Sequence, residues 1–201
     1  MIAIIDYDSG NIKSVEKALV TLGADPVVTR DKNTILSADH VILPGVGAFG
    51  DCMQHLQDYD LVGVIHDTIN SGKPFLGICV GMQLLFESSE ESPDVPGLGI
   101  FKGRFYRFRS DTDKIPHMGW NSISIRPGAT ILTGIGENPY VYFVHSYYLK
   151  ADDPSIVTAT CQYSQLFDAS VQKGNCFGTQ FHPEKSSRVG MKVLKNFLEV
   201  K

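Results

Sequence analysis

The architecture of this chain can be predicted from residues 74–86, which read Pro74-Phe75-Leu76-Gly77-Ile78-Cys79-Val80-Gly81-Met82-Gln83-Leu84-Leu85-Phe86. Apolar residues lead into Cys79, which has one glycine two positions before it and another two positions after it. This spacing is typical of a nucleophile elbow, in which a buried strand delivers the nucleophile to a sharp turn and a helix follows. Residues without a Cβ on both sides let the two elements approach closely. We therefore expect a strand over 75–78, a turn at Cys79 and a helix beyond it.

Cys79 itself has two interpretations. Free cysteine is among the most buried residue types, and in an apolar stretch it usually packs in the core. At the N-terminus of a helix, however, backbone N–H groups and the helix dipole favour the thiolate, which is the nucleophilic form. The glycine frame leaves the two interpretations about even. Other segments of the chain must separate them.

Size and composition indicate one globular domain over residues 1–201. The chain is 43% hydrophobic and 20% charged with a net charge of −4, as in folded rather than disordered proteins. No basic cluster indicates nucleic acid, and no apolar run is long enough to span a membrane. The first residues, Met1-Ile2-Ala3-Ile4-Ile5-Asp6, lack a basic leader and are typical of a strand. We therefore expect a cytoplasmic protein with no nucleic-acid or membrane partner.

The four cysteines give no sign of a metal or redox site. Cys52, Cys79, Cys161 and Cys176 form no C-x-x-C pair, which is the usual signal for a zinc ribbon or a thioredoxin-type site. In a reducing compartment they are expected to be free thiols. Only Cys79 has flanking glycines at the spacing of a nucleophile elbow, so we expect the other three cysteines to be packing residues. We expect no metal and no cofactor.

The first half of the chain alternates apolar strands with amphipathic helices. Apolar runs predict strands at 2–5, 26–29, 40–43 and 75–78, and helical periodicity predicts helices near 15–22 and 61–69. This alternation is typical of a doubly wound parallel sheet. In such sheets functional sites lie at the carboxyl ends of strands. Both Cys79 and the segment 44–47 fall at such ends.

The segment 44–47, Pro44-Gly45-Val46-Gly47, is either an ordinary turn or a loop of backbone donors. Acyl transfer needs N–H groups aimed at the oxyanion that develops during the reaction. In other elbows the residue after the nucleophile supplies one such donor. We therefore predict an oxyanion hole made by backbone N–H groups of Gly45, Val46, Gly47 and Val80.

The second half of the chain is richer in β-like runs. Residues 140–148 are aromatic and β-branched and predict a strand, as do residues 156–160. We expect these runs to extend the sheet with antiparallel strands. Before these runs lies the only tryptophan, Trp120, which is either a core residue or an aromatic anchor at an interface. A final helix is expected near 191–198, with Ser186 or Ser187 as its N-cap.

A catalytic thiolate needs a base close by and a group that orients the base. His182 can serve as the base, and Glu184, two residues on, can accept the other imidazole N–H. Each residue alone is better explained as an ordinary histidine or a solvated carboxylate. Taken with the elbow and the glycine loop, they predict a triad of Cys79, His182 and Glu184.

These segments resemble the class I, triad-type glutamine amidotransferases. The matching segments are 43–47, 76–83 and 181–184. More closely, the chain resembles the glutaminase subunits of imidazole glycerol phosphate synthase, and that finer match is carried by residues 6–11, 116–121, 145–147 and 182–187. Asp8 departs from the glycine often found there, and Val80 from the commoner leucine. Because Val80 would act through its backbone N–H, neither departure affects the expected chemistry.

The resemblance implies a fold and a reaction. The fold is α/β, a flavodoxin-like three-layer sandwich whose mostly parallel central sheet carries an antiparallel extension. The reaction is hydrolysis of glutamine to glutamate and ammonia, in which Cys79 forms a glutamyl thioester and His182 protonates the leaving ammonia and then activates water. Binding of the glutamine would fall to Gln83, His145, Ser146 and Tyr147, the last three through the backbone. Gln83 is nearly as well explained as a polar residue bonded locally.

The resemblance also implies a partner, because the chain has no P-loop or dinucleotide fingerprint to serve an ammonia-using domain. That partner is the cyclase subunit, a (β/α)8 barrel expected in a one-to-one heterodimer. It uses the ammonia to make imidazole glycerol phosphate and an aminoimidazole carboxamide nucleotide in histidine biosynthesis. Ammonia is mostly protonated in neutral water, so it must pass through a sheltered channel.

The expected interface comprises the 44–47 loop together with Met118, Trp120, Asn121 and Lys185. Because the oxyanion loop would then lie beside the partner, we expect the free subunit to hold it in an unproductive geometry. Binding of the partner and its nucleotide would shift the loop toward the productive one.

Three rival hypotheses stay open at this point. The chain could feed a different amidotransferase reaction, such as anthranilate, guanylate or pyridoxal synthesis, although residues 116–121 and 185–187 argue against that. It could be a non-catalytic assembly subunit, although the intact Cys79, His182 and Glu184 argue otherwise. It could also be a cysteine hydrolase acting alone, which a broad substrate panel without partner would reveal.

Overall fold

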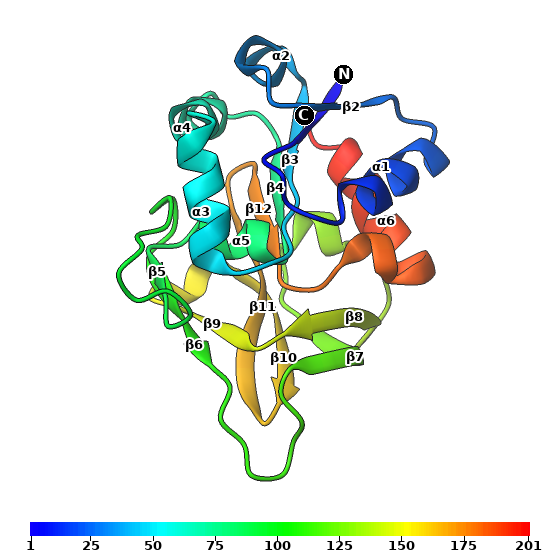
Figure 1. The fold of residues 1–201 in the computed structure, drawn as a ribbon. Helices are drawn as coiled ribbons and strands as arrows, with labels where there is room; N and C mark the ends of the chain where they lie inside the picture. Colours follow the sequence, from blue (N-terminus) through cyan, green and yellow to red (C-terminus); the bar gives the residue numbers. More distant parts are fainter.

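In a computed structural model describing residues 1–201, the chain folds around one twelve-stranded mixed sheet (Figure 1). The strands are β1 (Ile2–Ile5), β2 (Pro26–Thr29), β3 (His40–Leu43), β4 (Phe75–Ile78), β5 (Ser88–Ser89), β6 (Gly103–Arg107), β7 (His117–Ile125), β8 (Tyr140–His145), β9 (Tyr147–Ala151), β10 (Val157–Tyr163), β11 (Gln165–Lys173) and β12 (Cys176–Thr179). The main path runs β2-β1-β3-β4-β12-β11-β10-β7-β8. This order separates a parallel half from an antiparallel half.

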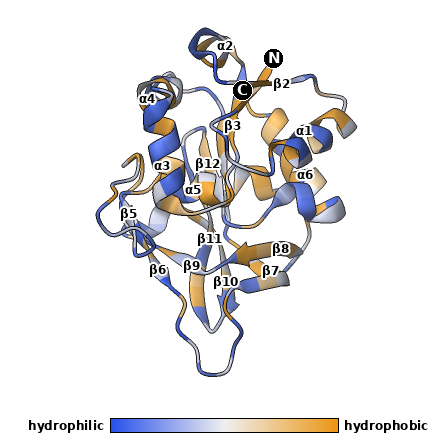
Figure 2. Ribbon diagram, in the orientation of Figure 1, coloured by the Kyte–Doolittle hydropathy of each residue, from blue (hydrophilic) through white to orange (hydrophobic).

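The parallel half consists of β2, β1, β3, β4 and β12, each hydrogen-bonded to its neighbour in parallel. Every residue of β1, β4 and β12 is buried, which explains why β1 and β4 read as apolar runs rather than as alternating patterns. Figure 2 shows the same apolar concentration along the central strands. The four strands expected in the first half of the sequence are all present with the expected bounds.

Helices cover both faces of this half. They are α1 (Ile12–Thr21), α2 (Lys32–Ser37), α3 (Phe49–Asp58), α4 (Val62–Asn70), α5 (Val80–Leu84) and α6 (Ser187–Leu198), with short 3-10 turns η1 (Thr130–Leu132), η2 (Pro154–Ile156) and η3 (Pro183–Lys185). In Figure 1, α1 and α6 lie on one side of the parallel strands, and α3, α4 and α5 lie on the other. The three-layer α/β arrangement expected from the sequence is confirmed.

The antiparallel half continues from β12 through β11, β10, β7 and β8. A short branch adds β9, which pairs with β11 and β6, and β5, which pairs with β6 in parallel. The single strand expected over 140–148 was wrong, because the chain breaks at Ser146 into β8 and β9. The break follows from a change of partner, since β8 pairs with β7 whereas β9 pairs with β6 and β11.

Two helices were not expected. Helix α3 places Phe49, Cys52, Met53 and Leu56 on its buried face, a spacing of helical period. This signal was masked because the helix begins directly after the glycine loop. Helix α2 has only six residues, and its main signal is the N-cap Asp31, whose carboxylate accepts the Thr34 N–H at 2.8 Å.

The start of α6 also differs from expectation. Ser186 occupies the N-cap position, but its hydroxyl makes no capping bond. Instead its Oγ donates to the His182 carbonyl at 2.6 Å and accepts the Tyr142 N–H at 2.9 Å. Ser186 therefore ties the segment carrying His182 to β8, which lies beside the pocket described below. None of the helices is long and apolar enough to cross a membrane.

Candidate active site

The turn at Cys79 has the geometry of a nucleophile elbow. Cys79 follows β4 directly, precedes α5, and has φ 54° and ψ −112°, a strained conformation for a residue with a side chain. A Cβ on Gly81 would lie 1.9 Å from the Leu43 carbonyl oxygen, and one on Gly77 would lie 2.7 Å from the Gly81 oxygen. Only glycine fits at both positions, because β3, β4 and α5 meet there at backbone distance.

His182 and Glu184 lie together beside this turn. His182 follows β12, the strand that pairs with β4, and Glu184 lies in η3. The imidazole Nδ1 and the Glu184 Oε1 are 2.7 Å apart, and neither side chain is exposed to solvent. Nε2 makes no hydrogen bond and is the ring nitrogen available for proton exchange with Cys79. The arrangement has the order of a triad, nucleophile to base to orienting carboxylate.

The charge state of His182 is set by its two neighbours. Burial alone would lower the pKa of His182, but the Cys79 sulfur and the Glu184 carboxylate raise this pKa to about 10. A cationic imidazole beside the sulfur favours the thiolate by charge attraction. The site is therefore suited to a thiolate–imidazolium pair at neutral pH.

Asn11 is a further member of this cluster that sequence reasoning missed. It precedes α1 in the left-handed conformation, with φ 73°. Its Nδ2 donates to Glu184 Oε1 at 2.6 Å and lies 3.4 Å from His182 Nδ1. The amide therefore fixes the carboxylate that orients the base. Its one sequence signal was its place in the polar turn at the carboxyl end of β1.

The other three cysteines differ from Cys79 in their surroundings. All four are free and buried. Burial raises the pKa of Cys52 to about 11 and those of Cys161 and Cys176 to about 12. These thiols stay protonated at neutral pH, as expected for packing residues.

A cavity of about 280 Å³ opens beside the elbow, a size suited to a small molecule. Its walls contain Val46, Gly47, Cys79, Val80, Gln83, Glu91, Pro116, Val144, His145, Ser146 and Tyr147. All four residues expected to hold glutamine line it, as do three of the four expected oxyanion residues. Glu91, Pro116 and Val144 were not expected. Among them Glu91 is the only carboxylate, and its loop composition gave no sign of this position.

Gln83 and a second buried glutamine lie between the elbow and β12. Gln83 Nε2 donates to Gln180 Oε1 at 3.2 Å, while Gln83 Oε1 is buried without a partner. Gln180 Nε2 lies 3.7 Å from the Cys79 sulfur, within the range of a hydrogen bond to sulfur. Gln180 was missed from the sequence, where its only signal was a polar side chain two residues before His182.

Two of the four expected oxyanion donors, Val46 and Val80, are engaged elsewhere in this conformation. The Val80 N–H donates to the Gly45 carbonyl at 3.3 Å, so this donor is already occupied. The Val46 N–H donates to Ser9 Oγ at 3.0 Å, and the Ser9 hydroxyl donates back to the Val46 carbonyl at 3.2 Å. Tyr7 holds the start of the loop through a 2.7 Å bond to the Pro44 carbonyl. The N–H groups of Val46 and Val80 are therefore both engaged within the protein, and we call this arrangement the closed loop.

The side chain of His145, whose expected role concerns the backbone, forms a buried pair with His117. His117 and His145 are paired directly across β7 and β8, and His117 Nδ1 is 2.9 Å from His145 Nε2. His145 Nδ1 donates to the Tyr147 carbonyl at 2.8 Å, since a carbonyl can only accept. His145 Nε2 then accepts from His117, whose Nε2 accepts from the Asn121 amide at 3.3 Å. This direction requires both rings to be neutral.

These two neutral histidines predict loss of stability in mild acid. Burial lowers the pKa of His117 to about 4 and that of His145 to about 3, from an ordinary value of 6.5. Between pH 6.5 and 4 the unfolded chain binds both protons and the folded chain does not. The free energy of unfolding should therefore fall with decreasing pH, near pH 5 by about 2.7 kcal/mol per pH unit for the pair.

Urea unfolding measured between pH 7.5 and 4.5 checks this slope. His117→Gln should reduce the slope by about half, because it removes one of the two protons. Gln57→Ala, at an exposed position of α3, removes no titrating group, so it is the control and should leave the slope unchanged. A free energy of unfolding independent of pH between 6.5 and 4.5 would contradict neutral buried rings.

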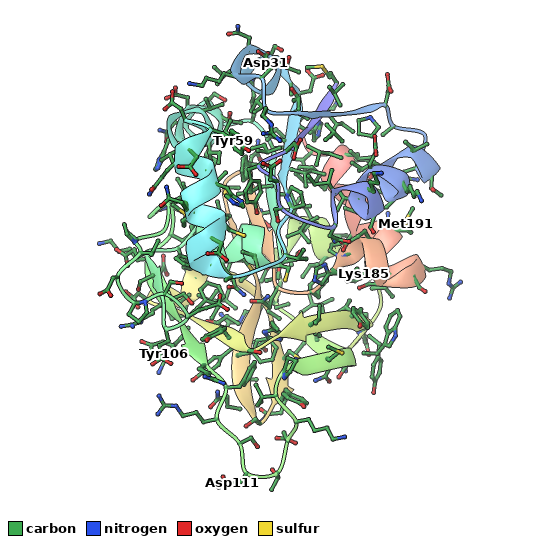
Figure 3. The ribbon with its side chains drawn as sticks, viewed as in Figure 1. Asp31, Tyr59, Tyr106, Asp111, Lys185 and Met191 are labelled. Atoms are coloured by element: carbon green, nitrogen blue, oxygen red, sulfur yellow. The ribbon has the colours of Figure 1, made fainter.

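The residues expected at a partner interface divide into two groups. On β7, Met118 and Trp120 are 63% and 50% exposed, and Tyr140 on the neighbouring strand β8 is 61% exposed, so apolar side chains gather on this edge. Lys185, labelled in Figure 3, is also exposed. Asn121 differs, because its amide donates to the Gln162 carbonyl at 3.0 Å as well as meeting His117. Its side chain is engaged within the chain.

No group of three or more histidine, cysteine or acidic side chains lies close enough to hold a metal ion. A buried cysteine, a base with an orienting carboxylate and an adjoining pocket together suit acyl transfer.

Comparison with known proteins gives results that agree along the whole length. A family model described as glutamine amidotransferase class-I matches residues 3–200. The imidazole glycerol phosphate synthase subunit HisH of Thermosynechococcus vestitus is 52% identical over 200 residues, covering 98% of this chain and 95% of that protein. The HisH subunit of Bacillus cereus is 51% identical, with 98% and 93% covered. HisH 1 of Methanococcus maripaludis is 47% identical, with 100% of both covered.

Solved structures share the fold at lower sequence identity. A glutamine amidotransferase superposes with a TM-score of 0.77 at 18% identity, covering 99% of this chain and 98% of that chain. PurLQS from Thermotoga maritima superposes with a TM-score of 0.76 at 22% identity, covering 98% and 97%. At such identities the likeness concerns the fold alone.

Proposed function

The chain belongs to the class-I glutamine amidotransferase family, and we propose that it is the glutaminase subunit of an imidazole glycerol phosphate synthase. The observation that carries the catalytic part is the strained Cys79 elbow beside the buried His182–Glu184 pair. The assignment to the synthase subunit is supported by relatives that bear this name and are about half identical over nearly the full length. The whole of residues 1–201 acts as one amidotransferase domain.

The first half of the reaction is acylation. The Cys79 thiolate attacks the side-chain amide carbon of glutamine and forms a C–S bond. The C–N bond breaks as His182 Nε2 gives its proton to the leaving nitrogen, so ammonia departs neutral. Glu184, held by Asn11, keeps Nδ1 bonded and therefore keeps Nε2 directed at the reacting atoms.

The second half is hydrolysis of the glutamyl thioester. His182, now neutral, takes a proton from water as the water oxygen attacks the thioester carbon. The C–S bond breaks, glutamate leaves, and the thiolate–imidazolium pair is restored. No cofactor or metal is needed at any step.

The pocket supplies groups for both ends of the amino acid. Glu91 can pair with the α-ammonium, because one of its carboxylate oxygens accepts the Phe49 N–H at 2.8 Å and the other is left for a ligand. Gln83 Oε1, buried without a partner, can accept a hydrogen bond from bound glutamine. Ser146 and Tyr147 complete the wall.

The closed loop supports regulation by the partner. The peptide between Gly45 and Val46 must rotate to withdraw its carbonyl from the Val80 N–H and to turn the Val46 N–H toward the pocket. The rotation breaks the Val80–Gly45 bond and the Val46–Ser9 bond, which hold the two ends of that peptide. Binding of the cyclase beside this loop favours the rotated state.

The partner is the cyclase subunit, bound one-to-one so that ammonia passes between the subunits without meeting bulk water. The exposed edge carrying Met118, Trp120 and Tyr140 provides an apolar contact of the kind found at the centre of interfaces. Four free thiols and a role in amino-acid biosynthesis support a cytoplasmic location.

Trp120→Ala is expected to weaken binding of the cyclase subunit at least about tenfold, because a buried aromatic anchor at an interface contributes more than 1 kcal/mol. Titration of the purified subunits measures the dissociation constant, and the ratio of product to glutamate measures coupling. Leu36→Ala, an exposed apolar residue on the distant helix α2, is the control. Unchanged affinity and coupling in Trp120→Ala would remove this edge from the interface.

A further inference from the structure

Gln180 is a fully buried amide that the reaction described above does not use. It lies one residue beyond β12 and two before His182, and its backbone N–H donates to the Ala169 carbonyl at 2.9 Å. Its side chain reaches the nucleophile, with Nε2 at 3.7 Å from the Cys79 sulfur. Its other end, Oε1, accepts from Gln83 Nε2 at 3.2 Å. One side chain therefore joins the reacting atom to the pocket wall.

The orientation of this amide follows from what the sulfur can do. A thiolate has no proton to donate and can only accept hydrogen bonds. The opposite orientation would place the Gln180 oxygen against the thiolate, where two electron-rich atoms repel each other. The Val144 carbonyl, 4.0 Å from the sulfur, already opposes negative charge there. An N–H from Gln180 is thus the orientation that a thiolate selects.

We propose that Gln180 is a catalytic residue that stabilises the Cys79 thiolate through its side-chain N–H and orients Gln83 through its side-chain oxygen. This inference rests on the proposed function, because it concerns the same nucleophile. The donor acts twice in the cycle. It favours formation of the thiolate that attacks, and it stabilises the thiolate that is expelled when the thioester is hydrolysed.

Other charged and titratable groups near the Cys79 sulfur also influence its ionisation, so their effect must be distinguished from that of Gln180. His182 is the one in direct contact, and Tyr7, Glu91 and His145 lie at the edge of the same site. None of these groups bonds to the Gln180 side chain. A substitution of Gln180 therefore removes its contacts with the Cys79 sulfur and with Gln83, while the hydrogen bonds of these titratable groups stay in place.

The test is the pH dependence of Cys79 alkylation by iodoacetamide in the purified subunit, followed by mass spectrometry of the Cys79 peptide. Gln180→Met keeps the length of the side chain and removes both amide bonds. The midpoint of its rate–pH profile should rise by about one pH unit, the effect expected for loss of one hydrogen bond to a charged group. Gln57→Met, at an exposed position of α3, is the matched control and should keep the native midpoint.

Gln180→Glu is the second variant. It retains an oxygen for Gln83 but replaces the N–H donor beside the sulfur, so its midpoint should also rise. Circular dichroism and thermal unfolding identify which of the two variants is folded. The midpoint of the alkylation profile is interpreted only for a folded variant. A native midpoint in a folded Gln180 variant would overturn the inference.

The outcomes separate this inference from the function on which it rests. Alkylation requires neither glutamine nor a partner. A shifted midpoint without glutamine hydrolysis in any mixture would contradict the proposed function but support the role of Gln180 at the sulfur. Glutamine hydrolysis with an unshifted midpoint would contradict the role of Gln180 alone.

Discussion

Replacing Cys79 with alanine is expected to abolish glutamine hydrolysis, lowering kcat by at least about 10⁴-fold, as for removal of other covalent nucleophiles. No other group can take over the attack. Cys52, Cys161 and Cys176 stay protonated at neutral pH because burial raises each pKa to about 11 or 12, and none of them lines the pocket. His182 alone can activate water but cannot form the thioester. The measurement is glutamate release by the complex with its cyclase.

Two controls make this result specific. Cys176→Ala removes a buried thiol at the start of β12 and should leave kcat within about threefold, since surface or packing changes away from a site affect stability first. The complex containing Cys79→Ala should still form product when ammonium salt replaces glutamine, because the cyclase is intact. Glutamine hydrolysis that survives in Cys79→Ala would remove this residue from the mechanism.

The free subunit is expected to hydrolyse glutamine about 10² to 10³-fold more slowly than the complex, the usual effect of losing an oxyanion donor. In the closed loop the Val80 N–H is held by the Gly45 carbonyl, and the Val46 N–H is held by Ser9. The oxyanion that develops on glutamine therefore meets a carbonyl oxygen instead of donors. The rate should recover when the partner and its nucleotide favour rotation of the peptide.

Ser9→Ala sharpens this expectation. It removes the acceptor of the Val46 N–H and the donor to the Val46 carbonyl, which both favour the closed loop. The partner-free rate should rise about fivefold to tenfold, corresponding to about 1 kcal/mol for a buried hydrogen bond. Ser14→Ala, at an exposed position of α1, is the control. A partner-free rate that does not change in Ser9→Ala would show that Ser9 does not hold the loop.

The parts of the fold that followed from sequence are those set by local pattern. The buried runs of β1, β3 and β4 have a single interpretation as parallel strands, and the glycines around Cys79 permit the close approach that an elbow requires. The triad could be predicted because its chemistry needs three residue types in a known order. Gln83, Ser146 and Tyr147 were expected at the pocket from resemblance, and they line it.

The parts that sequence did not yield depend on contacts between distant segments. Asn11 meets Glu184 across 173 positions, and Gln180 meets Cys79 across 101. No local spacing signals such pairs, since each joins segments that follow parallel strands ending at the same edge of the sheet. The state of the oxyanion loop was likewise hidden, because a peptide can rotate about Gly45 without any change in sequence pattern.

The most direct test of the proposed function is glutamate release from glutamine, measured for the chain alone, with a cyclase subunit, and with the cyclase subunit and its nucleotide ligand. We predict a slow rate alone, stimulation by about 10² to 10³-fold with partner and ligand, and loss of all three activities in Cys79→Ala. Equal rates in the three mixtures would contradict the proposal that the closed loop limits the rate until the partner binds. Absence of glutamate in every mixture would contradict assignment of this chain as the glutaminase.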